Sequence, residues 1–205
     1  MIYEFRTYDL RPRTIGEYEK VVGTALAGGR LKYSPLFGYW YTEFGPLNQA
    51  LHIWTYEDMK HRTEVRAKVA NLGYWPPPSG PMLAGQDSSI FLPAPFNDEK
   101  ITGNQGPYYE LRTYRYATGD MPKVIDSWGK AIGERRKHSA FIGCWYSEIG
   151  ELNIWQHMWA YKSLEERARI RKEMTEKSIW PPAGAPSPWV QTNRLFMPFP
   201  FSPLK

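Results

Sequence analysis

Apolar and polar residues alternate at the start of the chain. In residues 2–8, Tyr3 and Phe5 share one parity, and Glu4 and Arg6 share the other. Alternation with a period of two is typical of a β-strand with one buried face. Residues 14–31 instead carry apolar side chains three to four positions apart, which predicts a helix. These apolar residues are Ile15, Tyr18, Val22 and Leu26.

The remainder of the first half predicts three more strands and a second helix. Residues 37–44 and 47–55 are strand-like and flank Gly45-Pro46, which indicates a hairpin turn. Asp58 then stands where a helix cap is expected. A last strand is predicted at residues 88–92. The predicted order of elements is therefore strand, helix, strand, strand, helix, strand.

The second half repeats this pattern with similar residues. YEFRTY at residues 3–8 returns as YELRTY at 109–114, and HIWTY at 52–56 returns as HMWAY at 157–161. The offset is 106 at first and 105 later, so one residue is lost in the first helical region. A repeat over a whole half indicates tandem duplication of one module. We predict modules at residues 1–96 and 108–205, joined by a polar linker at 97–107.

The order of elements in each module is that of the ferredoxin-like β-α-β-β-α-β motif. Helices cover one face of such a sheet, and large aromatic residues remain on the other face. A module of this size cannot expose that face to water without cost. We therefore predict an α+β fold in which the two sheets pack face to face within one chain.

The repeated motifs also resemble those of the NIPSNAP family. The resemblance rests on the YEFRTY/YELRTY strands, the GYWYTEFGPLN/GCWYSEIGELN hairpins, the HIWTY/HMWAY strands and the Trp-Pro-Pro segments. It covers nearly the whole chain and implies a dimeric α+β barrel, here fused in tandem. That superfamily includes antibiotic-biosynthesis-type monooxygenases, haem-degrading monooxygenases and muconolactone isomerases. The family itself has no agreed catalytic motif.

Composition and charge narrow the possible functions. The chain of 205 residues has a net charge of +5, but its basic residues are dispersed and no RNA-binding motif is present, so no nucleic-acid partner is predicted. No apolar run approaches the roughly 20 residues of a membrane span. Cys144 is the only cysteine, and no signal peptide is recognisable. We expect a soluble cytoplasmic protein, and exposed Trp and Pro-rich loops are compatible with a homodimer.

The candidate chemistry lies on the polar parity of the first and third strands of each module. If the helices cover the more apolar parity, this polar and aromatic set faces the barrel lumen. The catalytic candidates are His52, His157, Arg6 and Arg112. The substrate-binding candidates are Glu4, Tyr8, Trp54, Glu110, Tyr114 and Trp159.

Two interpretations of this set remain open. An Arg can stabilise an oxyanion, a His can move a proton and a Trp can stack on a ring, which suits binding or conversion of a small aromatic or anionic molecule, as in a monooxygenase or isomerase. Alternatively, the Glu and Arg residues form a structural ion network, and the protein is a non-enzymatic interaction module. No metal-ligand spacing is present, and paired Trp residues would crowd a haem, so no metal or cofactor is predicted.

Overall fold

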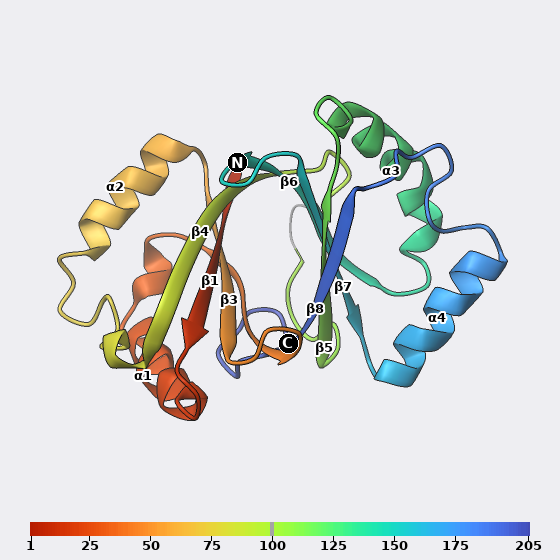
Figure 1. Cartoon of the computed structure of the whole chain (residues 1–205). Helices are drawn as coiled ribbons and strands as arrows, with labels where there is room; N and C mark the ends of the chain where they lie inside the picture. Colours follow the sequence, from red (N-terminus) through yellow and green to blue (C-terminus); the bar gives the residue numbers. More distant parts are fainter. Residues whose placement is uncertain (99–100) are drawn as a thin grey trace.

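The computed structural model describes residues 1–98 and 101–205. Each half has the predicted order of elements (Figure 1). The first half contains β1 (Ile2–Leu10), α1 (Ile15–Ala27), β2 (Leu36–Phe44), β3 (Gln49–Tyr56), α2 (Met59–Val69) and β4 (Leu83–Pro93). The second half contains β5 (Tyr108–Arg115), α3 (Met121–Arg135), β6 (Ala140–Ile149), β7 (Ile154–Tyr161), α4 (Leu164–Glu176) and β8 (Val190–Pro198).

The eight strands form one closed barrel in the order β1-β3-β2-β8-β5-β7-β6-β4. All neighbouring strands are antiparallel, and β1 pairs with β3 as the split βαβ motif requires. The two halves join where β2 pairs with β8 and where β4 pairs with β6. Closure leaves no unpaired sheet edge. The predicted tandem α+β barrel is confirmed.

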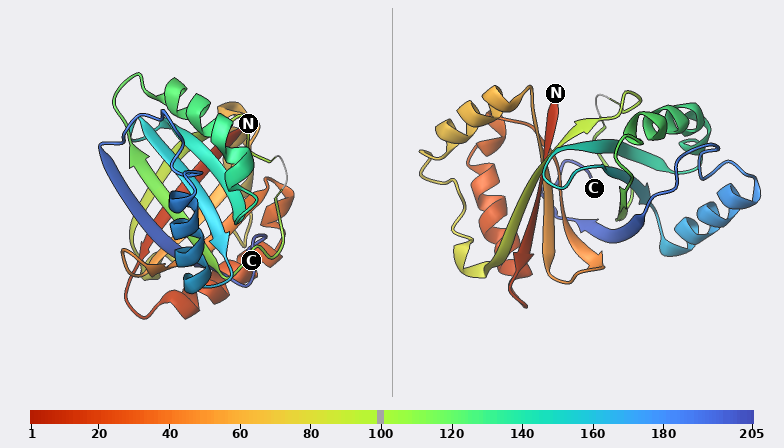
Figure 2. Two further views of the ribbon diagram at one scale, coloured as in Figure 1. Left: turned by 90° about the vertical axis from the view of Figure 1, so that its right-hand side faces the viewer. Right: turned by 45° about the horizontal axis from the view of Figure 1, so that its top comes forward.

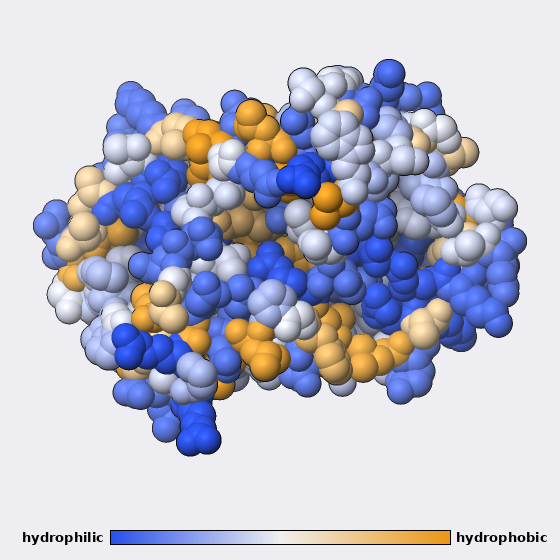
Figure 3. All heavy atoms as spheres, in the orientation of Figure 1, coloured by the Kyte–Doolittle hydropathy of each residue, from blue (hydrophilic) through white to orange (hydrophobic). Residues whose placement is uncertain are grey.

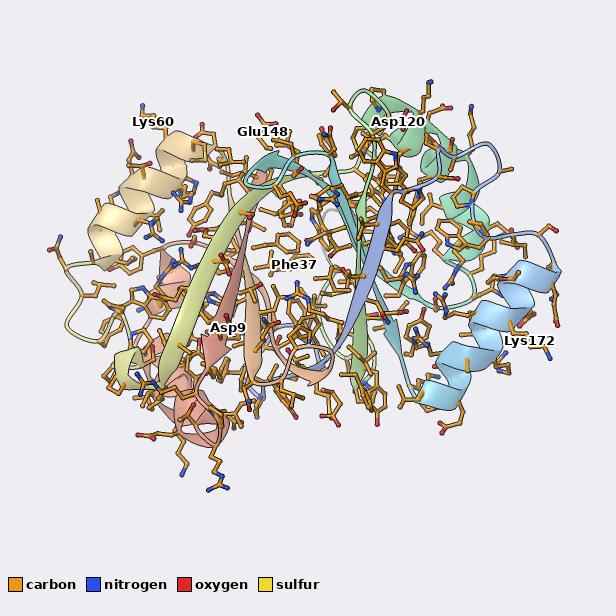
Figure 4. The ribbon with its side chains drawn as sticks, in the orientation of Figure 1. Asp9, Phe37, Lys60, Asp120, Glu148 and Lys172 are labelled. Carbon is orange, nitrogen blue, oxygen red and sulfur yellow. The ribbon has the colours of Figure 1, made fainter. Side chains whose placement is uncertain are left out.

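The helices lie outside the barrel, with α1 and α2 on one flank and α3 and α4 on the opposite flank (Figure 2). The barrel interior is filled by apolar side chains from both halves. Phe37 on β2, for example, lies between the two sheets (Figure 4) and contacts the rings of Tyr3 and Trp145. Leu51, Ile53, Leu111 and Met158 belong to the same interior cluster.

The prediction that the polar and aromatic set faces the lumen is therefore wrong. Glu4 and Glu110 point to the helix side of their sheets, because each forms an ion pair with an arginine of a covering helix, Arg62 on α2 and Arg167 on α4. The space between two sheets is buried from both sides and favours apolar residues. The arginine-bearing helices supply the charged partners that buried carboxylates need.

The GxW motif in β2 and β6 has a steric cause. The Trp40 indole lies over Gly38, where a Cβ atom would approach the ring to 2.0 Å. Gly143 stands in the same relation to Trp145, at 2.6 Å. Both indoles are fully buried in the interior cluster. Glycine at these positions therefore allows each sheet to accommodate a large ring across its own backbone.

Each half also receives a short segment from the end of the other half. Beyond β8, the backbone N–H of Tyr39 donates to Ser202 Oγ at 2.9 Å, and Phe199 N donates to the Tyr39 carbonyl at 3.0 Å. Beyond β4, Asn97 exchanges two hydrogen bonds with the backbone of Cys144, at 2.8 and 2.9 Å. The modules are therefore interlocked at both ends.

Polar residues predominate on the face shown in Figure 3, where apolar residues form several separate groups. The exposed apolar residues include the hairpin-tip pairs Phe44 and Leu47, and Ile149 and Leu152. Among residues 1–98 and 101–205, no helix is both long and apolar enough to span a membrane.

Candidate functional site

Each half contains a cavity between the outer face of its sheet and its covering helices. The N-terminal cavity has a volume of about 400 Å³ and is lined mainly by β1, β3, α2 and the loop after α2. The C-terminal cavity has a volume of about 200 Å³ and is lined by the corresponding elements β5, β7 and α4. The predicted site residues are thus divided between two sites and do not meet in one lumen.

A buried carboxylate lies at the base of the N-terminal cavity. Glu4 is fully buried, and its Oε1 accepts from Arg6 Nη1 at 2.8 Å, Arg62 Nη2 at 2.7 Å and Ser88 Oγ at 2.8 Å. Burial would raise the pKa of Glu4, but the Arg62 and Ser88 hydrogen bonds and the Arg6 charge outweigh it and lower the pKa to about 2. Glu4 is therefore an anion at neutral pH.

The C-terminal half repeats this network. Glu110 Oε1 accepts from Arg112 at 3.1 Å, Arg167 at 2.5 Å and Asn193 at 3.2 Å. Burial opposes ionisation, yet these arginines hold the pKa of Glu110 below its usual value. Glu110 lies behind the cavity wall, and Arg112 lines the cavity itself. In both halves the carboxylate thus anchors an arginine at the cavity.

The histidine of each cavity is held in one tautomer. Trp54 Nε1 donates to His52 Nδ1 at 2.7 Å, and Trp159 Nε1 donates to His157 Nδ1 at 2.9 Å. An indole nitrogen only donates, so Nδ1 must be the unprotonated nitrogen and Nε2 must carry the hydrogen. Burial lowers the pKa of both histidines well below the usual value. Each ring is therefore a neutral hydrogen-bond donor at Nε2, and its basic nitrogen is occupied.

A second arginine in the N-terminal cavity has no carboxylate partner among the described residues. Arg30 is 3% exposed, and its guanidinium lies 4.1 Å from the centre of the Trp54 ring and 5.1 Å from that of Trp75. Its Nη1 donates to Ser34 Oγ at 3.0 Å, and its buried Nε has no hydrogen-bond partner in the described chain. Burial lowers the pKa of Arg30, but a guanidinium remains protonated in a protein.

Sequence reasoning missed Arg30 and its counterpart Arg135. Arg135 is the last residue of α3, and Arg30 lies in the 3-10 turn that follows α1. The duplication itself contained the signal, because Arg30-x-x-x-Ser34 returns as Arg135-x-x-x-Ser139 at the offset of 105. The Arg135 guanidinium likewise lies 4.1 Å from the centre of the Trp159 ring and donates to Ser139 Oγ.

Two tyrosines form a wall that exists only in the N-terminal cavity. Tyr39 stacks on His52 with ring centres 4.5 Å apart and planes inclined by 6°, and its hydroxyl shares a hydrogen bond with that of Tyr18. Burial raises the pKa of both tyrosines, so both remain protonated. Phe201 of the C-terminal segment packs edge-on against the Tyr39 ring at 5.3 Å. The second half therefore helps to position a wall of the first cavity.

The corresponding wall of the C-terminal cavity is different. Val124 and Cys144 take the places of Tyr18 and Tyr39, and Trp128 takes the place of Val22. The Trp128 ring lies 4.6 Å from that of His157 and 4.5 Å from that of Trp180. An indole thus occupies the region between the histidine and the Trp-Pro-Pro loop. The C-terminal cavity, which His157 and Trp180 line, has about half the volume of the N-terminal cavity.

The structure brings the candidates of each module together. Glu4, Arg6, Tyr8, His52 and Trp54 all line the N-terminal cavity. Of the second set, Arg112, Tyr114, His157 and Trp159 line the C-terminal cavity. Within the described residues, no group of three or more His, Cys, Asp or Glu side chains is placed to hold a metal ion.

Comparison with known proteins identifies one family by sequence and further proteins with a similar fold by structure. The sequence profile of the NIPSNAP family matches residues 3–98 and 109–203. NipSnap homolog 2 of Danio rerio is 29% identical over 215 residues, covering 100% of this chain and 75% of its own. A solved protein from Fusobacterium nucleatum, proposed to be a monooxygenase, has a TM-score of 0.68 at 10% identity and covers 97% of this chain and 92% of its own. An anthrone oxidase-like protein has a TM-score of 0.59 at 10% identity, with coverages of 96% and 90%.

Proposed function

The chain belongs to the NIPSNAP family, and we propose that its N-terminal cavity binds a small aromatic molecule that carries a negative charge. The observation behind this proposal is Arg30, a buried cation that lines the cavity without a carboxylate partner among the described residues. A buried charge is costly unless it is paired. A bound anion would supply the missing partner.

The other charges at the cavity support an anionic ligand. Glu4 is the only carboxylate among the lining residues, and its Oε1 is already shared by Arg6 and Arg62. Arg66, which is half-exposed at the helix, also lines the cavity. The lining therefore carries three arginines against one glutamate. An excess of positive charge in a partly enclosed space favours anions and attracts them from solution.

The shape and walls of the cavity support an aromatic ligand. A volume of about 400 Å³ falls in the range of small-molecule sites, about 300–1,000 Å³. Tyr8, Tyr39, Trp54 and Trp75 contribute ring faces or edges to its lining. Flat rigid walls favour a flat ligand, because stacked and edge-to-face ring contacts add to the area that is buried. A single or fused ring with one acidic group is the best match.

The histidine geometry narrows the chemistry that this cavity supports. His52 Nδ1 is engaged by Trp54, so the ring offers a hydrogen-bond donor and no free base. Proton abstraction by His52 is therefore disfavoured, and binding is the primary function that we propose. If the bound molecule is also converted, as in cofactor-free oxygenation or isomerisation, it would enter already ionised. Arg6 and Arg30 would then stabilise its oxyanion, as the fold relationship to oxygenase-like proteins suggests.

Calorimetric titration with 2-naphthoate tests the proposal. We expect one binding equivalent in the unmodified protein, and weaker binding of the neutral isostere 2-naphthamide. Arg30→Met retains the aliphatic stem and removes the charge, so it should weaken 2-naphthoate binding by roughly tenfold to a hundredfold. Arg135→Met is the matched control in the other half and should bind normally.

Thermal unfolding of both variants shows whether the fold is retained. Equal binding of 2-naphthoate and 2-naphthamide would contradict recognition of the charge. Binding of neither compound, in a folded protein, would instead favour a purely structural barrel and an interaction module.

A further inference from the structure

We propose that the C-terminal cavity is a separate binding site for a compact oxyanion, with inorganic phosphate as the representative of that class. The proposal rests on the charges, volume and wall of this cavity alone. It therefore stands or falls independently of aromatic binding in the first half.

Arg135 is the buried cation of this site. It is 3% exposed, it lies over the Trp159 ring, and no described carboxylate forms an ion pair with it. Its Nη1 donates to Ser139 Oγ at 2.6 Å and its Nη2 donates to the Tyr161 hydroxyl at 3.5 Å. A guanidinium has five N–H donors, so these two neutral partners leave both its charge and further donors uncompensated.

The lining of the C-terminal cavity is more cationic than that of the first. Arg112, Arg135 and Arg171 line it, and the lining contains no carboxylate. Glu110, the nearest acidic network, directs its bonded oxygen to Arg112 and Arg167. Arg171 on α4 forms no ion pair with any described residue. Two unpaired guanidinium groups facing one cavity favour an oxyanion, because the planar fork of arginine matches carboxylate and phosphate oxygens.

The volume excludes a ligand with a fused ring. The cavity measures about 200 Å³, which is below the roughly 300 Å³ at which small-molecule sites begin. Trp128 occupies the region that remains open in the first half, and it is itself held by His157 and Trp180. The exposed Thr175 adds a hydroxyl to the lining where the first half has Ala70, and Gln191 repeats the amide of Gln86. A compact polar anion fits this site better than a flat ring.

Phosphate titrations at constant ionic strength test the inference. Calorimetry with the unmodified protein should detect one phosphate site. Arg135→Met and Arg171→Met should each weaken phosphate binding, the buried Arg135 by roughly tenfold to a hundredfold. Arg30→Met and Arg66→Met are the matched controls in the first half and should bind phosphate normally. Because Arg171 is only half-buried, its variant remains informative if Arg135→Met does not fold.

A second titration separates this inference from aromatic binding. Saturating phosphate should leave the affinity for 2-naphthoate unchanged, because the two ligands occupy different cavities. Competition between them, or unchanged phosphate binding in folded Arg171→Met and Arg135→Met, would overturn the inference. So would the absence of a phosphate site in the unmodified protein. The phosphate titrations of the unmodified protein and of its arginine variants do not depend on whether 2-naphthoate binds in the first half.

Discussion

The N-terminal and C-terminal cavities are built on the same duplicated residues, and they differ mainly in one wall. Both have a histidine held by a tryptophan and a buried arginine over that tryptophan. Both also have a carboxylate held by arginines, which lines the cavity in the first half and lies behind the cavity wall in the second. In the first half, Tyr18 and Tyr39 line an open space. In the second half, Trp128 fills the corresponding space. The volumes are accordingly about 400 and 200 Å³.

This difference shows which parts of a duplicated site can change independently. Glu4 accepts from three residues on three different elements, so replacing any of them leaves the others without a complete set of partners. Tyr18, Val22 and Tyr39 contribute to the wall mainly through their volume. Exchanging ring and aliphatic volume between neighbours preserves packing while it changes the space left for a ligand. In the two proposed sites, the wall would therefore set ligand specificity, and the ion networks would maintain the cavity.

The largest expected effect comes from removing the indole that closes the C-terminal cavity. Trp128→Val restores the residue type of Val22 and should lower the free energy of unfolding by about 3–5 kcal/mol, because a buried ring is lost. The same change should open the cavity to a ring. We expect the 2-naphthoate stoichiometry in calorimetry to rise from one to two.

The converse exchange serves as the control. Tyr18→Val, Val22→Trp and Tyr39→Cys together copy the second wall into the first half and should abolish 2-naphthoate binding. If folded Trp128→Val still binds a single equivalent, the wall does not determine the difference between the halves.

A smaller effect, of the same sign in both halves, is expected for the carboxylates. The pKa of Glu4 falls from 4.5 to about 2 on folding, which corresponds to about 3 kcal/mol of stability. Because the folded pKa is depressed, this contribution is present above pH 4.5 and is lost as the pH falls towards 2. Glu4→Gln should therefore be about 3 kcal/mol less stable at neutral pH, and the deficit should shrink between pH 4.5 and 2.

Urea unfolding at a series of pH values measures this effect. Glu110→Gln should show a deficit of the same sign, since its pKa is also lowered. A deficit in only one half would mean that the two ion networks are not equivalent.

The sequence was sufficient to predict the order of elements, the duplication and the barrel. The alternation of apolar and polar residues in strands and their spacing in helices are local properties of the sequence. Because the pattern occurs in both halves, each element is predicted twice. Which face of each sheet the helices cover is not a local property of the sequence. Both parities of β3 carry large or apolar side chains, from Leu51 and Ile53 to His52 and Trp54, so hydrophobicity alone did not identify the face that the helices cover. The decisive contact joins Arg62 to Glu4, 58 positions apart, and no periodicity reveals such a pair.

Only part of the candidate site could be predicted from the sequence, because only some of its residues lie in recognisable local patterns. The residues on β1 and β3 were recognised because they recur in strong strand motifs. Arg30 falls within the predicted helical range 14–31, but α1 ends at Ala27 and Arg30 lies in a short 3-10 turn after two glycines. The spacing of apolar residues does not single out a charged residue there. The closure of the C-terminal cavity depends on Trp128, an apolar residue in a helix whose position resembles ordinary core packing. Its effect on the cavity follows only from its contacts with His157 and Trp180.

The smallest effect concerns the two histidines, which should behave alike despite their different walls. Burial lowers the pKa of His52 and His157 well below 6.5, so the unfolded chain binds protons more readily. The stability contributed by their neutral forms is therefore present above pH 6.5 and is lost as the pH falls below it, by at most about 1.4 kcal/mol per pH unit for each histidine. His52→Leu and His157→Leu should each remove part of this slope between pH 6.5 and 5, and the double variant should remove both parts. At pH 8 the free energy of unfolding should change by about 1 kcal/mol or less, because leucine leaves the Trp54 or Trp159 indole N–H without a partner but also removes a buried unpaired Nε2.

Urea midpoints at constant slope measure both the stability at pH 8 and its pH dependence for the two histidine variants. An unchanged pH slope in the double variant would mean that the pKa values of the two histidines do not change on folding. Unequal slopes in the single variants would show that the Tyr39 or Trp128 wall influences the protonation of its histidine.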